Sequence, residues 1–228
     1  LTDDIESTGH KYYALAGVGG LFEQMQWLRG PANVYMDLAQ DSPELHELAD
    51  RLVQYRLDTV ENAMDAGADG CGFGDDWGAQ HALLISPDLW RTFFKPRYEK
   101  VFTAVRSRGG HVWFHTDGYT WPILDDLIEI GVSVLNPQHT VMGNRKVAER
   151  IGSRVCLRTD LDRQHLLPSG TPQAIDKEVR ELVSLFGNEE GGLILHGEVG
   201  PDVPFENIKA MYEAFEKYGS SPGQLNRR

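Results

Sequence analysis

Cysteine, long apolar runs and basic residues are scarce in this sequence, and each scarcity excludes a class of protein. Two cysteines, Cys71 and Cys156, are too few for a disulfide framework or a four-cysteine zinc site. No apolar run approaches the length of a membrane span. Lysine and arginine total 22 against 34 acidic residues, a formal net charge of −12. Such a charge disfavours binding to nucleic acid or to an anionic membrane surface.

Two catalytic and binding motifs are missing as well. There is no Gly-x-Ser-x-Gly segment to expose a nucleophilic serine. No Gly-x-Gly-x-x-Gly turn follows a strand, and Gly17-Val18-Gly19-Gly20 is the nearest approach to that dinucleotide motif. The sequence opens with Leu1 and shows no secretory signal, so we expect a cytoplasmic protein whose N-terminal part is missing here.

Six short apolar segments have the composition of buried parallel strands. They are Ala14–Gly19, Asp69–Asp75, His111–Asp117, Val132–Asn136, Val155–Asp160 and Gly192–Glu198. Apolar residues between them recur at helical spacing, and helix starts are indicated at Ser42-Pro43, Ser86-Pro87 and Thr171-Pro172. We expect a kink at Pro96 in the second of these helices. Strands that alternate with helices predict an α/β fold with a parallel sheet.

The spacing of these segments favours a barrel. Their starts lie about 36 residues apart on average, close to the roughly 31 residues of one unit in a (β/α)8 barrel. We therefore predict a TIM barrel domain over residues 1–219, truncated at its N-terminus to about six βα units. A polar tail over residues 220–228 follows. A complete, doubly wound open sheet of six strands is the alternative.

Polar residues gather where the predicted strands end, the edge at which both folds bind ligands. Asp75, Asp76 and Trp77 close the second strand. Neighbouring residues on a strand point to opposite faces, so only one of the two carboxylates can face a ligand. Trp77 and the nearby His81 could face the same pocket. A turn in which the aspartates bond their own backbone is the alternative.

Two strands carry a histidine and an acid two positions apart, which places both side chains on one face. These pairs are His115 with Asp117 and His196 with Glu198. Imidazole and carboxylate together suit zinc. The alternatives are a core histidine oriented by its aspartate, and ion pairs between elements. Arg158 and Asp160 end the fifth strand, where an anion site and simple salt bridging are both open.

Eight segments of the sequence resemble motifs of the uroporphyrinogen decarboxylase superfamily. They occur in the same order and at matching spacing over nearly the whole chain. They are Gly74–Gly78, Leu84–Pro87, Phe94–Tyr98, His115–Gly118, Leu127–Gly131, Leu135–Pro137, Pro201–Pro204 and Glu206–Ile208. The resemblance implies a (β/α)8 barrel whose first strands precede this chain. The superfamily contains porphyrinogen decarboxylases, which use no cofactor, and zinc methyltransferases that move a methyl group between a corrinoid and a thiol.

The two branches imply different site chemistry. Methyltransferases bind zinc with His-x-Cys at this strand and a cysteine at the last strand. His115 matches the first ligand and Asp117 replaces the first cysteine, while His196 or Glu198 stands near the second. The resemblance thus implies zinc held by His115, Asp117 and Glu198, a harder Lewis acid than a thiolate site. The decarboxylase branch ends its last strand in His-Gly, as His196-Gly197 does here.

We therefore predict metal-assisted, corrinoid-linked methyl transfer, or demethylation of a small methylated compound. Asp75 or Asp76 would orient substrate or take a proton, and His196 would act as a general acid or base. The remaining candidate substrate contacts are Trp77, His81, Asn136, Arg158 and Asp160.

Two alternative functions stay open. One is cofactor-free decarboxylation of uroporphyrinogen or a related polycarboxylate. The other is a non-catalytic scaffold that binds a corrinoid or tetrapyrrole. For partners, we expect a small-molecule substrate, a corrinoid protein and a homodimer, without nucleic acid or membrane.

Overall fold

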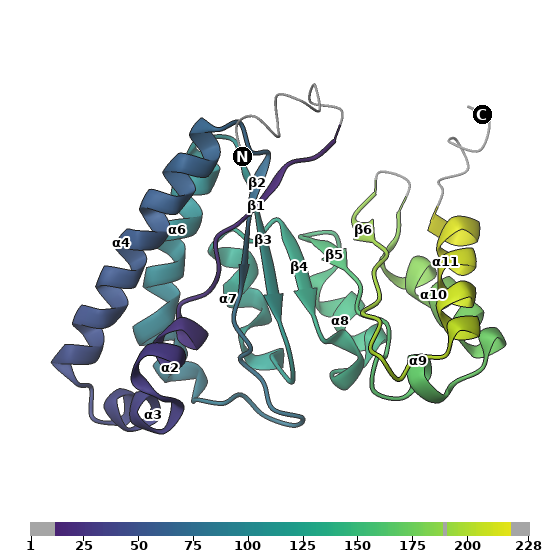
Figure 1. Cartoon of the computed structure of the whole chain (residues 1–228), viewed down its shortest axis with the longest axis horizontal. Helices are drawn as coiled ribbons and strands as arrows, with labels where there is room; N and C mark the ends of the chain where they lie inside the picture. Colours follow the sequence, from purple (N-terminus) through teal and green to yellow (C-terminus); the bar gives the residue numbers. More distant parts are fainter. Residues whose placement is uncertain (1–11, 189–190, 220–228) are drawn as a thin grey trace. The chain divides into compact units, whose positions relative to one another are not determined.

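A computed structural model describes residues 12–188 and 191–219 (Figure 1). The polar tail predicted at 220–228 lies outside the described residues. Contacts group the chain into two compact units, the N-terminal unit (Leu1–Val134) and the C-terminal unit (Leu135–Arg228). The predicted site residues are divided between these two units.

Each of the six predicted strand segments contains a strand. The strands are β1 (Leu15–Gly17), β2 (Gly70–Gly74), β3 (His111–Thr116), β4 (Val134–Pro137), β5 (Cys156–Arg158) and β6 (Leu193–Ile194). Helices separate consecutive strands along the chain, and one follows the last strand. This alternation confirms the predicted fold class, a barrel-type α/β chain with about six βα units.

The N-terminal unit contains a parallel sheet of β1, β2 and β3. Its helices are α2 (Phe22–Arg29), α3 (Pro31–Ala39), α4 (Pro43–Asp65), α5 (Pro87–Leu89), α6 (Lys95–Ser107) and α7 (Leu124–Glu129). A 3-10 turn, η2 (Trp121–Ile123), precedes α7. Figure 1 shows α4 and α6 side by side on this sheet. The strands' carboxyl ends therefore share one edge, where the connecting loops meet.

Helices begin at Pro43 and Pro87 as predicted, but the Ser42 side chain does not cap α4, and the second helix differs locally. Ser86 Oγ accepts a hydrogen bond from the Leu89 amide at 3.1 Å and so caps α5. The expected kink at Pro96 takes the form of a π-helical turn, η1 (Trp90–Phe94), directly before α6. Pro96 lacks an amide hydrogen, and it lies in the first turn of α6, where that loss is tolerated. The turn directs Trp90, Phe93 and Phe94 into the core.

The C-terminal unit contains the parallel pair β5–β6, in the register Leu157 with Leu193. Its helices are α8 (Asn144–Ile151), α9 (Leu166–Ser169), α10 (Pro172–Phe186) and α11 (Phe205–Gly219), and its 3-10 turn is η3 (His139–Val141). Thr171 caps α10 by accepting the Ala174 amide at 3.2 Å. Apolar residues of α9, α10 and α11 form one buried cluster that includes Leu167, Val179 and Met211.

None of the helices in the described part of the chain has both the length and the hydropathy of a membrane span.

Candidate metal centre

The ladder between β2 and β3 continues beyond the strands and sets which side chains meet. The register pairs Gly74 with His115. The Asp75 amide donates to the His115 carbonyl at 3.2 Å, and the Gly78 amide donates to the Asp117 carbonyl at 3.0 Å. Because side chains alternate along each strand, Asp76 lies on the same face as His115 and Asp117. Asp75 lies on the opposite face.

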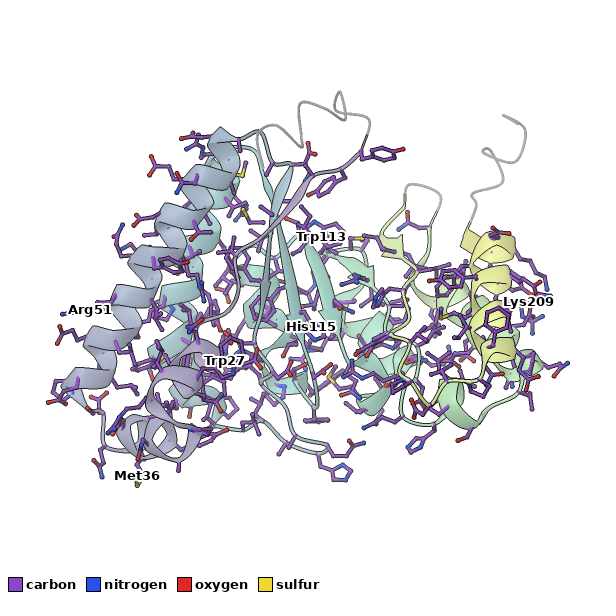
Figure 2. All side chains as sticks on the ribbon, in the orientation of Figure 1. Trp27, Met36, Arg51, Trp113, His115 and Lys209 are labelled. Atoms are coloured by element: carbon purple, nitrogen blue, oxygen red, sulfur yellow. The ribbon has the colours of Figure 1, made fainter. Side chains whose placement is uncertain are left out.

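Asp76, His115 and Asp117 come together as a compact group, which we call the His115 cluster. Each offers a ligand atom within 4.8 Å of the others. His115 Nε2 is 3.7 Å from Asp76 Oδ1 and 3.6 Å from Asp117 Oδ1. The Asp117 amide also donates to Asp76 Oδ1 at 3.0 Å, which orients that carboxylate. Figure 2 labels His115 on β3.

The donor set of the cluster fits a divalent metal. Zinc binds imidazole nitrogen and carboxylate oxygen at about 2.0–2.2 Å, so two ligands of a tetrahedral ion lie about 3.4 Å apart. The observed separations of 3.6 and 3.7 Å approach that value. One nitrogen and two oxygens would leave a fourth position open. The cluster therefore has the spacing and the chemistry of a three-ligand site.

A close approach of two glycines permits this geometry. Gly118 has φ +77°, and a Cβ there would lie 2.1 Å from the Gly78 carbonyl oxygen. A Cβ on Gly78 would in turn lie 2.3 Å from the Tyr119 amide nitrogen. Side chains at these positions would push the β2 and β3 loops apart. Asp76 and Asp117 would then separate.

Asp75, predicted as an alternative catalytic acid, has a structural environment instead. Its side chain is fully buried and accepts hydrogen bonds from the Leu21, Phe22 and Glu23 amides at 2.6, 3.0 and 2.8 Å. The Tyr98 hydroxyl donates to the same carboxylate. Burial raises the pKa of Asp75, and these hydrogen bonds lower it in part. Asp75 therefore anchors the start of α2, where helix amides lack partners.

Trp77 does not form the expected wall of a pocket. It is fully buried, with its ring stacked on Phe22 at 4.4 Å and edge-on to Phe94 at 4.6 Å. The large apolar ring belongs to the core, where burial gains most. His81 is exposed and lies in a shallow pocket that Leu84 and Tyr119 also line. Its place among the substrate contacts stays a prediction.

The remaining candidates lie in the C-terminal unit and interact there with one another. Asn136 Nδ2 donates to the carbonyl oxygens of Arg158 and Thr159 at 3.1 and 3.2 Å. Arg158 donates back to Asn136 Oδ1 at 3.3 Å, and burial lowers the pKa of its guanidinium. These contacts fix the end of β5, and they leave substrate roles for both residues as predictions.

His196 and Glu198, the second histidine–acid pair of the sequence, have different partners. The His196 amide donates to Thr159 Oγ1 at 2.6 Å, and its carbonyl accepts from the same hydroxyl at 2.7 Å. Glu198 pairs with Arg163, which also lies 3.5 Å from Asp160. An arginine thus compensates the Glu198 charge within this unit. The metal-ligand role of Glu198 and the acid–base role of His196 stay predictions.

Glu23 is a neighbour of the cluster that the sequence reasoning did not select. Its amide is tied to Asp75, and its half-buried carboxyl interacts electrostatically with Asp76, Asp117 and His115. Burial raises the pKa of Glu23, and Asp76 raises it further. The sequence could in principle have indicated Glu23, because this residue follows β1 at the edge where β2 and β3 also end.

Comparisons with known proteins agree with this architecture. The family described as uroporphyrinogen decarboxylase (URO-D) matches residues 7–218. Uroporphyrinogen decarboxylase of Coxiella burnetii is 26% identical over 188 residues, 79% of this chain and 49% of the relative. The Pseudomonas putida enzyme is 27% identical over 193 residues, covering 79% and 52%. This chain therefore spans about half the length of these curated relatives.

A solved structure shares the fold. A methyltransferase from Methanosarcina mazei superposes with a TM-score of 0.77 at 24% sequence identity, covering 96% of this chain and 63% of the other. The parallel strands and intervening helices define a barrel-type α/β protein, and an acid–histidine cluster lies at the carboxyl edge of its strands. The chain belongs to the uroporphyrinogen decarboxylase family, as its motifs predicted.

Proposed function

We propose that this chain carries the metal-holding part of an enzyme for corrinoid-linked methyl transfer or demethylation of a small methylated compound. The observation that carries the proposal is the His115 cluster, in which one imidazole and two carboxylates gather within 4.8 Å. The fold shared with the Methanosarcina mazei methyltransferase is consistent with it.

All three residues of the cluster would act as metal ligands. His115, Asp76 and Asp117 would hold zinc, with Asp76 in the place that the sequence prediction gave to Glu198. A bound zinc supplies a Lewis acid that polarises an oxygen or another heteroatom of the substrate. Because two of the three ligands are carboxylates, this Lewis acid is harder than one held by thiolates. Substrates whose methyl group is bound to oxygen therefore suit this site better than thiol substrates do.

An assay of the full chain tests this function. Zinc-loaded and chelator-treated protein are incubated with a methoxylated aromatic compound and a reduced free corrinoid, and methylcorrinoid is measured by its absorbance. We expect methyl transfer only with zinc, and a loss of about 100-fold or more in Asp117→Asn because a first ligand is removed. Transfer that is equal with and without zinc would contradict the proposal.

Cofactor-free decarboxylation is the second candidate, since the curated relatives are named uroporphyrinogen decarboxylase. Two acids at the strand edge disfavour a substrate with many carboxylates, because like charges repel. The same protein preparations can be incubated with uroporphyrinogen and the release of carbon dioxide measured. Turnover that persists after chelation, and that is unchanged in Asp117→Asn, would favour this candidate over methyl transfer.

A further inference from the structure

Trp113 shares one face of β3 with His115, as Figure 2 shows for the two labelled residues. Side chains alternate between the faces of a strand, so these two residues point the same way and lie about 6.6 Å apart along it. Val112 and Phe114, on the other face, are buried, and the Phe114 ring contacts Phe102 of α6. Trp113 and His115 are only half-buried. They therefore lie on the face of the sheet opposite to α6.

The Trp113 indole is held in one orientation by Tyr13. Its Nε1–H donates to the Tyr13 hydroxyl at 3.1 Å, and that hydroxyl donates to the Asp69 carbonyl at 3.1 Å. The Tyr13 side chain precedes β1 and reaches β3 by crossing β2 at Gly70, where a Cβ would lie 2.4 Å from the hydroxyl oxygen. A ring fixed in this way loses little freedom when a ligand binds to it.

Backbone without side chains lies next to the indole. The register pairs Gly72 with Trp113, and Gly17 with Gly72, so all three residues share one face. Within the described part of the chain, a Cβ on Gly17 would have no atom within 4 Å, and one on Gly72 would have its nearest neighbours at 3.7 Å. Glycines in a strand interior often mark the close approach of a ligand. The space beside Trp113 is therefore open to a flat group.

The side chains that border this space are apolar. Leu15 lies on the side of Gly72 opposite to Trp113, because its Cδ2 would be among the nearest atoms to a Cβ on Gly72. Leucine and the indole face carry no charge, and an indole stacks well on another aromatic ring. A charged group would lose its hydration here without gaining a partner from these two side chains. A neutral, planar ring fits this surroundings best.

We propose that Trp113 determines substrate specificity, by stacking its indole against the aromatic ring of a neutral methyl ether whose methoxy group points toward His115. This inference rests on the proposed function, because it names the substrate class of the same site. The rise of about 6.6 Å between the two residues is comparable to the length of one six-membered ring with its methoxy group. Gly72 lets the ring lie flat beside the indole.

Binding of two matched probes to the full chain tests this proposal without an activity assay. Methoxybenzene is planar, and methoxycyclohexane has the same ether on a non-planar ring. Their dissociation constants are measured by ligand-observed NMR titration, with and without zinc. We expect wild type to prefer methoxybenzene by about fivefold or more, and Trp113→Leu to lose this preference. The control Trp27→Leu, at a 74% exposed tryptophan of α2, should retain it.

A second variant decides if Trp113→Leu does not fold. Gly72→Ala adds a methyl group at ordinary contact distance, so the fold should persist while methoxybenzene binding weakens about threefold or more. No measurable preference in wild type, or a preference that both variants retain, overturns the inference and leaves zinc-dependent methyl transfer untouched. A preference that depends on Trp113, with methyl transfer equal with and without zinc, supports the ring site and overturns the proposed function instead.

Discussion

Similar residue types close the strands of both units, but their partners differ. In the C-terminal unit, Glu198 and Asp160 both lie against the Arg163 guanidinium. In the N-terminal unit, Asp76 and Asp117 both lie beside the His115 imidazole. Acids matched by a guanidinium stabilise a loop, whereas two acids beside one histidine have the donor set of a cation site. The composition of a strand end therefore does not reveal its role, but its partners do.

The same contrast holds between two adjacent residues. Asp75 is fully buried and bonded to the start of α2, and Asp76 is part of the His115 cluster. Both follow the same strand, so the pleat alone separates them. The predictions below test each side of this contrast.

The largest effect is expected from the glycine contact that brings the two acids of the cluster together. Gly118→Ala would place a Cβ 2.1 Å from a carbonyl oxygen and should destabilise the protein by about 3 kcal/mol, since both strain and a clash result. Gly109→Ala is a matched control, because Gly109 has φ +80° but no atom within 4 Å. It should cost about 1 kcal/mol. Urea unfolding measures the loss of stability in both variants. Equal losses would show that the contact between Gly118 and Gly78 is not tight.

Asp75→Asn and Asp76→Asn should separate stability from binding. We expect Asp75→Asn to lower the free energy of unfolding by about 2–3 kcal/mol, because buried donors lose a charged acceptor. Asp76→Asn should change it by less than about 0.5 kcal/mol, since relief of repulsion offsets a lost hydrogen bond. Zinc affinity should fall in Asp76→Asn. The reverse pattern in urea unfolding would contradict the division of roles between these two neighbours.

The free energy of unfolding should depend on pH through His139, a buried histidine of the C-terminal unit. His139 is fully buried, its Nδ1–H donates to Asn144 Oδ1 at 2.8 Å, and its Nε2 accepts from the Asp160 amide at 3.1 Å. Burial lowers the pKa of His139 below its usual value of about 6.5, so the unfolded chain binds the extra proton first. Stability from this group is therefore complete above that value and falls as the pH drops below it.

Unfolding free energies measured from pH 7.5 to pH 5 for wild type and His139→Gln test this point. The difference between the two should shrink as the pH falls. A difference that is constant with pH would show that His139 does not titrate with folding.

The smallest effect is expected at Glu198. Because Arg163 already compensates its charge, Glu198→Gln should leave zinc affinity within about twofold of wild type and cost less than about 1 kcal/mol of stability. A loss of zinc affinity like that of Asp117→Asn would restore Glu198 as a ligand, as the family resemblance implied. Arg163→Gln serves as the matched control for breaking the ion pair.

The strands and the pairing of His115 with Asp117 were predictable because they depend on local periodicity. The alternation of side chains also predicted that only one of Asp75 and Asp76 faces a ligand. Which of them lies on the same face as His115 depends on the register between β2 and β3, a long-range property that the local sequence does not encode. The burial of Trp77 depends in the same way on Phe22 and Phe94, which arrive from two different helices.

Glu23 was missed for a related reason. The short helices α2 and α3 carry weak apolar patterns, and the glycines before α2 were considered only as an incomplete dinucleotide motif. Tertiary contact with Asp75 gives this turn its significance. Local sequence patterns do not reveal residues whose positions depend on partners far away in the chain.

Metal content is the most direct test of the central claim, that the His115 cluster binds a divalent metal. Wild type and His115→Ala are purified alike, equilibrated with Zn²⁺, desalted, and measured by mass spectrometry, with His46→Ala as a control at an exposed ion pair of the same unit. We predict about one zinc per chain in wild type and control, and less than about one tenth of that in His115→Ala. Equal zinc in all three proteins, or none in wild type, would contradict the account.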